Sequence, residues 1–294
     1  MWNDFGLTIE GSSLVSCVMV TNGRPDQIAC SLKSFLSQTY QSKELIIVSQ
    51  GSSEDNDKIQ QMIYGHKSIE FVEAPKRLSL GGMRNLSVEL AQGEIICQWD
   101  DDDYYHPNRI LTQYKCLRGK HVASLYTQYL KYFADTGRLY LIDHLRGTDD
   151  YVKVMNQYPF KKYLCGSVMF RKSCFYEANN LLYPECGNQS DKEEDLNVLQ
   201  RLMKMGEIAP VNVGYEYCYV YHGGNVYQRR HHELVFHKKY CADAERLLFF
   251  RSQIEHLLSI AGVTNPVDIC SSPILDFDNP ETHLEGTLVF RYEP

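Results

Sequence analysis

The sequence predicts an α/β protein with a doubly wound, mostly parallel (mixed) sheet flanked by helices and followed by a helical C-terminal appendage. Two observations predict this class. Short apolar runs alternate with amphipathic stretches between residues 14 and 103, as in successive β-α-β units of an open sheet. Hydrophobic residues form 44% and aromatic residues 12% of the 294-residue chain, which is enough for a substantial packed core.

Four runs are predicted to be buried strands because they are short and largely apolar. They cover residues 14–23, 43–49, 68–75 and 95–99. The helices predicted between them cover residues 24–40, 57–66 and 80–94. In the first of these helices, Ile28, Leu32 and Phe35 have helical spacing, and Pro25 suits the first turn. Gly93 is the expected stop of the third helix.

The rest of the chain is less regular. We expect a two-stranded hairpin around the turn at 134–138, then a strand, an amphipathic helix with acids at its start, and a late aromatic strand. These elements cover residues 121–142, 164–175, 191–207 and 215–225. A long helical pattern over 231–262, broken at most once, and an irregular proline-containing tail follow. The predicted domains are therefore residues 1–225 and 226–294.

The charge and composition of the chain argue against several classes of protein. The net charge is −7, and the basic residues are spread along the chain rather than gathered in a block that could neutralise nucleic-acid phosphates. No apolar run approaches the ~18–20 residues of a spanning helix, and "MWNDFGLTIEGSS" does not resemble a signal peptide. We therefore expect a soluble, cytoplasmic protein. Its ten cysteines form no C-x-x-C pair and are expected to be reduced thiols, mostly in the core.

Polar residues follow three predicted strands, at Thr21–Arg24, Ser49–Gly51 and Asp100–Asp103. Ligands of open α/β sheets bind beyond these carboxyl ends. Four adjacent aspartates repel one another by about 3–4 kcal/mol per close pair, and here they follow a buried strand directly, between Trp99 and Tyr104. Such a cluster needs a cation, and Mg²⁺ and Mn²⁺ prefer oxygen ligands. A solvated acidic turn is the alternative interpretation.

The ordered set of motifs resembles family 2 glycosyltransferases. It comprises "LVSCVMVTNGRPDQIACSLKSFLSQTY…ELIIVSQGS", "LGGMRNLSVELAQGEIICQWDDDDYYHPNRI" and "EEDLNVLQRLMKMG", and it extends from residue 14 to about 225. The resemblance implies the GT-A fold, a nucleotide-diphosphate sugar donor and inversion at the anomeric carbon. It also implies a divalent metal, Mn²⁺ or Mg²⁺, at a D-x-D motif. Residues 1–225 would then bind the nucleotide sugar and carry out catalysis.

The family's acidic segment falls on Trp99–Asp103. The resemblance implies that Asp102 contacts the metal directly, while Asp100 faces the ribose or reaches the metal through water. Asp103 would orient the sugar or the loop. Asp101 falls on the family's variable position and is expected to tolerate replacement best. His222, after the late strand, is a further candidate for metal or diphosphate contact, with an ordinary packed histidine as the alternative.

The acidic helix start resembles the family's "ED" motif, whose aspartate is the catalytic base. This implies Asp195 as general base with Glu194 beside it. An inverting transfer needs one carboxylate to take the proton of the acceptor hydroxyl. Acids that complement the helix dipole in a first turn are the alternative interpretation.

The resemblance also implies a set of nucleotide-sugar contacts. These are Thr21, Asn22, Arg24, Gly81 and Arg84, together with Asp100, Asp101 and Asp103. Where the family usually has "VDDGS", this chain has "VSQGS", so Gln50 replaces the acid that commonly reads the base. A glutamine both donates and accepts hydrogen bonds, so uracil fits, and thymine and guanine stay open.

The resulting hypothesis is a metal-dependent transfer of a sugar to a hydroxyl of a glycan or glycolipid. A UDP-sugar is the first candidate for the donor. A solvated basic turn is expected at residues 228–232, and Arg229, Arg230 or His232 as a clamp on the diphosphate is the alternative. The C-terminal helix would dock on its own domain, on the inner face of a membrane or on a second copy of the chain. A nucleotidyltransferase and a non-catalytic sugar-nucleotide-binding module stay open. "VTNGRPDQ" lacks the lysine normal in the phosphate loop of the former.

Overall fold

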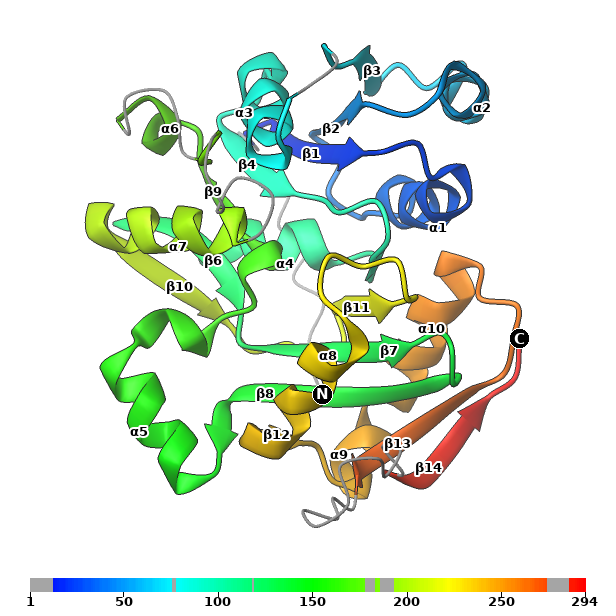
Figure 1. The fold of residues 1–294 in the computed structure, drawn as a ribbon, viewed down its shortest axis with the longest axis vertical. Helices are drawn as coiled ribbons and strands as arrows, with labels where there is room; N and C mark the ends of the chain where they lie inside the picture. The colour runs from blue at the N-terminus through cyan, green and yellow to red at the C-terminus, as the bar shows by residue number, and fades with distance from the viewer. Residues whose placement is uncertain (1–12, 76–77, 118, 178–182, 186–192, 274–285) are drawn as a thin grey trace.

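The computed structural model describes residues 13–75, 78–117, 119–177, 183–185, 193–273 and 286–294. These residues form two seven-stranded sheets flanked by helices (Figure 1). The predicted α/β class, with a mostly parallel mixed sheet and helices near the C-terminus, is confirmed. Cys186 and tail residues 274–285 lie outside the described part of the chain, and the other nine cysteines are free thiols, as expected.

The first sheet contains the four strands predicted from the apolar runs. Its strands are β1 (Val15–Thr21), β2 (Lys43–Ser49), β3 (Ile69–Glu73), β4 (Ile95–Gln98), β6 (His121–Tyr126), β9 (Met169–Arg171) and β10 (Glu207–Val211). Their order is β10-β6-β9-β4-β1-β2-β3. The sheet is mixed because β9 runs antiparallel to β4 and β6, whereas β1 is parallel to β2 and β4. The carboxyl ends of β1, β2 and β4 therefore meet at one edge.

Helices cover both faces of this sheet, which explains why its central strands are apolar on both sides. The helices around it are α1 (Pro25–Leu36), α2 (Ser53–Ile63), α3 (Leu80–Leu90), α4 (Arg109–Cys116) and α7 (Glu194–Met205). Met19 of β1 belongs to one core cluster with Phe35 of α1. Its neighbour Val18 belongs to a second cluster, with Val88 of α3. Alternate residues of one strand thus pack against different helices.

The second sheet differs from the expectation for residues 121–142. Its strands are β5 (Tyr104–Tyr105), β7 (Gln128–Phe133), β8 (Arg138–Gly147), β11 (Tyr217–Tyr221), β12 (Lys239–Cys241), β13 (Val267–Pro273) and β14 (Gly286–Tyr292). Their order is β14-β13-β8-β7-β11-β5, and β12 pairs with β8. The hairpin β7–β8 forms around the expected turn, but the residues before it form β6 of the first sheet. The chain crosses at Thr127, which bonds to Val211 and His144 through its backbone, and no glycine or proline marks this crossing.

The C-terminal region contains more strand than expected. Its helices are α8 (Arg229–Lys238), α9 (Ala244–Phe249) and α10 (Arg251–Ala261), so the long helical pattern is interrupted by β12 and again before α10. The tail after Gly262 is not irregular throughout, because β13 and β14 pair antiparallel. Val267, Ile269 and Phe290 on these strands belong to one buried cluster with Leu247 of α9 and Ile254 of α10. None of the helices in the described residues is long and apolar enough to cross a membrane.

Four shorter helical elements lie between β8 and α7 in the described residues. These are α5 (Asp149–Gln157), α6 (Ser173–Glu177) and the 3₁₀ turns Pro159–Lys162 and Cys165–Ser167. In addition, α10 packs against α1, so the C-terminal helix docks on the first part of the same chain.

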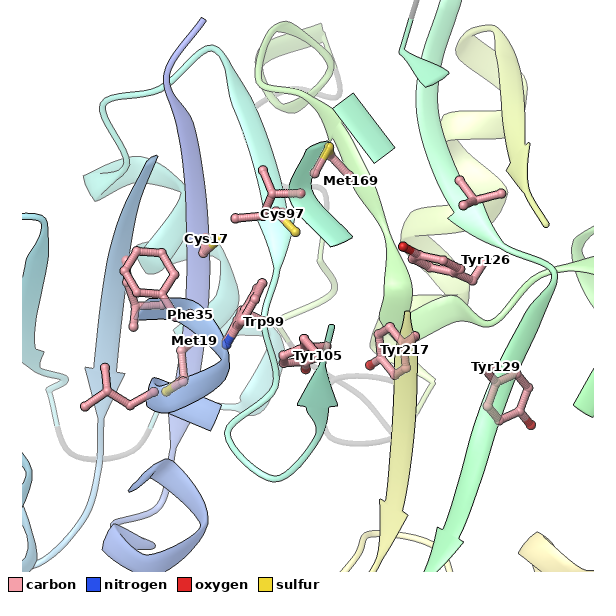
Figure 2. Packing of buried hydrophobic residues seen from close by; sticks show 14 of the residues in the cluster. Cys17, Met19, Phe35, Cys97, Trp99, Tyr105, Tyr126, Tyr129, Met169 and Tyr217 are labelled. Atoms are coloured by element: carbon pink, nitrogen blue, oxygen red, sulfur yellow. The ribbon is translucent and has the colours of Figure 1, made fainter. Parts of the chain in front are cut away.

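A buried arginine links the two sheets below the aspartates. The guanidinium of Arg109 lies 4.8 Å from the ring centroid of Trp99, 4.1 Å from that of Tyr105 and 4.8 Å from that of Tyr217. Its Nη2 donates to the carbonyl of Gln98 at 2.7 Å. Desolvated cation–π contacts reach about 2 kcal/mol. Figure 2 shows the three rings in a row between the sheets, so the end of β4 is fixed relative to β11.

Candidate active site

A cavity of about 760 Å³ lies beyond the carboxyl ends of β1, β2 and β4 and extends to β7 and β8 of the second sheet. Most of the residues predicted from the sequence line it. They are Thr21, Asn22, Arg24, Gln50, Arg84, Asp100, Asp101, Asp102, Asp103, Glu194 and Asp195. His222 is connected to the cavity through Asp102. Gly81 is buried in the first turn of α3, beside the cavity rather than in its lining.

Two of the four aspartates, Asp101 and Asp103, are almost fully buried as well as bonded to protein groups. Asp103 is 2% exposed and accepts hydrogen bonds from the Tyr217 hydroxyl at 2.6 Å and the Val220 amide at 2.9 Å. Asp101, also buried, forms an ion pair with Arg24. Burial and the charge of Asp102 raise the pKa of Asp101 to about 6 and hold the pKa of Asp103 well above its usual range. These contacts argue against the expected tolerance of Asp101, because breaking a largely buried ion pair destabilises a fold.

Asp102 is the aspartate best placed to receive a cation. Its Oδ2 lies 3.0 Å from Nη1 of Arg24 and 3.0 Å from Nε2 of His222. Burial alone would raise the pKa of Asp102. Hydrogen bonding from His222 and the charge of Arg24 outweigh this effect and lower the pKa. Asp102 is therefore ionised at neutral pH. Arg24, which was expected in the base and ribose pocket, is engaged by Asp101 and Asp102.

Arg84 connects the aspartates to the start of α7. Its Nη2 donates to Oδ1 of Asp100 at 3.0 Å, and its Nε donates to Oε1 of Glu194 at 3.1 Å. The Arg84 side chain is 8% exposed, so both ion pairs are shielded from water. Asp100 and Glu194 are thereby held in place across the floor of the cavity.

Asp195 differs from its neighbour because it has no ion-pair partner among the described residues. One carboxylate oxygen accepts a hydrogen bond from the Leu196 amide at 2.7 Å. Burial and then the charge of Glu194 raise the pKa of Asp195 to about 7. The helix begins after Glu193, whose φ of 64° is left-handed, a conformation that costs a non-glycine residue about 1–3 kcal/mol. A carboxyl group with a pKa near neutrality suits proton transfer at physiological pH.

The nucleotide side of the cavity contains an oriented amide. Nε2 of Gln50 donates to the Leu78 carbonyl at 3.0 Å. This bond fixes the amide group and leaves its oxygen as the acceptor for a ligand. Beside it, the Thr21 hydroxyl accepts a hydrogen bond from the Gly23 amide at 3.2 Å and shapes the loop that carries Asn22.

The loops after β1 and β2 contact each other through glycines. A Cβ built on Gly51 would lie 2.5 Å from the Cα and 2.9 Å from the N of Gly23. Both atoms belong to the backbone, so no side-chain movement relieves the clash. The close approach of these loops places Asn22 and Gln50 on the same side of the cavity.

We expect Gly51→Ala to push these loops apart. The free energy of unfolding should fall by about 1–3 kcal/mol, as in other overpacked sites, and nucleoside-diphosphate binding should weaken. Urea unfolding and nucleotide titration measure the two effects. Ser53→Ala, at an exposed position at the start of α2, is the matched control. Full nucleotide affinity in Gly51→Ala would show that the loop contact does not shape the binding site.

The groups around Asp102 fit a divalent cation in part. Asp102 and His222 lie together, and carboxylate oxygen and imidazole nitrogen both suit Mn²⁺. Asp100, the third expected ligand, is held by Arg84 instead. Within the described residues, no cluster of three or more His, Cys, Asp or Glu side chains is arranged to hold a metal. Sites of the magnesium type use one or two carboxylates and complete their coordination with phosphate oxygens, which fits this arrangement.

Sequence reasoning missed the opposite wall of the cavity. This wall includes Tyr129, Lys131, His144, Tyr219, Tyr227, His231 and Lys239. His232, one of the three alternative clamp residues, lies on it too. Of the other two, Arg229 pairs with Asp135 and Glu233, and Arg230 is exposed. Lys131 and His144 each occur inside a strand that contains many apolar residues, so no local pattern marks them. Only the strand pairing of the second sheet brings them together.

Comparison with known proteins agrees with this architecture. The family model described as Glycosyl transferase family 2 matches residues 16–177, more than half of the chain. An uncharacterized glycosyltransferase of Methanocaldococcus jannaschii is 27% identical over 156 residues, which is 51% of this chain and 52% of that protein. The UDP-Glc:alpha-D-GlcNAc-diphosphoundecaprenol beta-1,3-glucosyltransferase WfgD of Escherichia coli is 27% identical over 40% of this chain and 46% of its own. The matches thus span about half the length of these relatives.

Solved structures share the fold. S. aureus TarS 1-349 in complex with UDP-GlcNAc superposes with a TM-score of 0.55 at 13% identity, covering 84% of this chain and 73% of that one. The mannosyltransferase PcManGT from Pyrobaculum calidifontis, in complex with GDP-Man and Mn2+, also gives a TM-score of 0.55, at 12% identity, with coverages of 86% and 74%. The family match, the ordered motifs and the shared fold agree, and the chain belongs to glycosyl transferase family 2.

Proposed function

We propose that this protein transfers a sugar from a nucleotide-diphosphate sugar to a hydroxyl group of an acceptor, with inversion at the anomeric carbon. One observation carries the proposal. Asp195, a carboxyl group whose pKa is about 7 and which has no ion-pair partner in the described chain, shares a cavity with the ionised Asp102. An inverting transfer needs these two groups, one to accept a proton and one to help hold the diphosphate.

In the proposed reaction, the acceptor oxygen forms a bond to the anomeric carbon as the bond from that carbon to the diphosphate oxygen breaks. The acceptor proton passes to Asp195, and the electron pair of the broken bond leaves with the nucleoside diphosphate. Arg84 holds Asp100 and Glu194 in place within the cavity. Asp102 and His222 would hold Mn²⁺ or Mg²⁺, which supplies positive charge for the leaving diphosphate when bound.

The donor is proposed to be a UDP-sugar. The Gln50 amide, oriented by Leu78, presents an oxygen that can accept a hydrogen bond from the imide N–H of uracil. The same oxygen also suits the N1–H of guanine. The structural neighbours include complexes with UDP, with UDP-GlcNAc and with GDP-Man, so both bases occur in proteins of this fold.

The acceptor is proposed to be a glycan or glycolipid. Two E. coli relatives are named for transfer to a sugar on diphosphoundecaprenol, which is a lipid-linked acceptor. We also propose that residues 1–225 contain the donor site, since every donor-side group named above lies within them.

The proposal predicts that one nucleoside diphosphate stabilises the protein in a metal-dependent manner. A ligand present at 100 times its Kd stabilises the folded state by about 2.7 kcal/mol, which raises the Tm by several degrees. Thermal unfolding with UDP, GDP, dTDP and ADP, each with Mn²⁺ or with EDTA, measures this effect. Absence of a response to every nucleotide would contradict the proposed function. A response to GDP alone would keep the function and change the donor.

A further inference from the structure

Two lysines that line the cavity have no carboxylate partner among the described residues. Lys131 is 2% exposed, and its Nζ lies 2.7 Å from Nδ1 of His232 and 3.6 Å from the ring centroid of Tyr219. Nζ of Lys239 lies 2.7 Å from Nε2 of His144. Neither lysine forms an ion pair within the described part of the chain. A buried charged group is normally paired with a group of opposite charge. Within the described residues, these two lysines lack such an anionic partner.

The strand pairing places these groups on one face of the second sheet. Lys131 on β7 stands beside Tyr219 on β11, and Tyr129 points to the same side two residues earlier. The ring of Tyr129 lies 5.2 Å from that of His144 on β8. Leu130, between Tyr129 and Lys131, packs in an apolar cluster on the other face. The strand pairing of the second sheet therefore places Tyr129, Lys131 and His144 on the same face.

The helix α8 connects this wall to the side of the cavity that contains Asp195. The His231 ring stacks on the Tyr227 ring, with centroids 4.2 Å apart and planes 17° apart. Burial, followed by the charges of Glu193 and Asp195, raises the pKa of Tyr227, and both Tyr227 and Asp195 line the cavity. The lysine wall is thus next to the candidate base, whereas Gln50 and Thr21 line the donor side.

The protonation of the wall is sensitive to an added anion. Burial lowers the pKa of Lys131 well below its usual range, against the attraction of Asp103, and lowers the pKa of Lys239 to about 7. Burial and the neighbouring Lys131 lower the pKa of His232 to about 3, so this ring is neutral. Asp103 is already bonded to Tyr217 and Val220. An anion between the lysines would favour their charged forms.

We propose that Lys131 and Lys239 form an anion subsite that binds a phosphate group of the acceptor, in the same cavity as the hydroxyl that is glycosylated. This inference rests on the proposed function. The lysines supply compact positive charges of the kind that bind phosphate, and the histidines orient them. An acceptor phosphate is favoured over the donor diphosphate because Tyr227 and His231 connect the wall to the side of the cavity that contains Asp195, which receives the acceptor proton in the proposed reaction.

Inorganic phosphate is the probe for this subsite. Thermal unfolding is followed in rising phosphate, with acetate at equal ionic strength as the reference anion. The wild-type protein should be stabilised by phosphate, and Lys131→Met and Lys239→Met should each weaken its apparent affinity about tenfold or more, as for loss of a charged hydrogen bond. Lys153→Met, at an exposed lysine on α5, is the control that should behave as wild type. Methionine fits a buried lysine site by size, so folding is preserved.

A second experiment distinguishes an acceptor phosphate from the donor diphosphate as the ligand of the lysines. The same variants are titrated with UDP or GDP and Mn²⁺, and their nucleotide affinity should equal that of the wild type. Parallel loss of phosphate and nucleotide binding would assign the wall to the donor and overturn the proposal. Equal stabilisation by acetate, or undiminished phosphate binding in both lysine variants, would also overturn it. Failure of the wild type to bind any nucleotide would instead contradict the proposed function, so the two failures are distinct.

Discussion

Asp195→Asn is expected to leave nucleotide binding intact and to reduce sugar transfer by about 10²–10⁴-fold, the range for a positioned general base. The amide keeps the size of the side chain but cannot accept the acceptor proton. Nucleotide affinity should persist because Asp195 is not among the groups assigned to donor binding. Steady-state transfer rates and nucleotide titration measure the two effects.

The pH dependence of sugar transfer gives a second test of Asp195 as the base. The pKa of Asp195 is raised to about 7, mainly by burial and then by Glu194, so the base is protonated below this pH. The kcat/KM of the wild type should rise as pH increases through about 7, and this rise should be absent in Asp195→Asn. A raised carboxyl pKa also means that ionisation opposes folding above the unfolded pKa. The asparagine variant should therefore be at least as stable as the wild type at pH 8.

Asp149→Asn is the matched control, because Asp149 is an exposed acid in the first turn of α5. If Asp195 only complemented a helix dipole, both variants would lose a few tenths of a kcal/mol of stability and no activity. Transfer by Asp195→Asn near the wild-type rate would exclude Asp195 as the base.

The donor half of the cavity was predictable because its signals are local. The apolar runs of β1, β2 and β4 each end in polar residues, and parallel strands bring such ends to one edge. The "EED" helix start is likewise a contiguous motif. For these segments the family resemblance and the residue pattern indicate the same candidate site residues.

The second sheet was harder to predict because its organisation depends on distant pairings. Nothing in the sequence around Thr127 shows that the chain leaves one sheet for the other there. Lys131 becomes part of the cavity only through pairing with β11, about ninety residues later. The pairing of Arg24 with Asp101 joins residues 77 positions apart. Such contacts are set by the folded arrangement and leave no periodic pattern in the sequence.

Asp102→Asn is expected to remove the metal dependence of nucleotide binding. Asp102 is the ionised aspartate whose oxygen faces both Arg24 and His222, and asparagine removes its charge. Loss of groups that only support metal ligands costs about 10–100-fold in affinity, so loss of a direct ligand should cost at least about 100-fold. Thermal shifts with the best nucleotide, with and without Mn²⁺, measure the difference, and Mn²⁺ binding can be followed separately by electron paramagnetic resonance.

Asp101→Asn is the control within the same loop. Asp101 is paired with Arg24 and buried, and its contacts do not include His222, so this variant should keep the Mn²⁺-dependent increment in nucleotide binding. The two neighbouring substitutions thus separate the pairing of Asp101 with Arg24 from the role of Asp102 in metal binding. An Mn²⁺ effect that survives in Asp102→Asn and disappears in Asp101→Asn would reverse the assignment, because the residue at the family's variable position would then be the one that holds the cation.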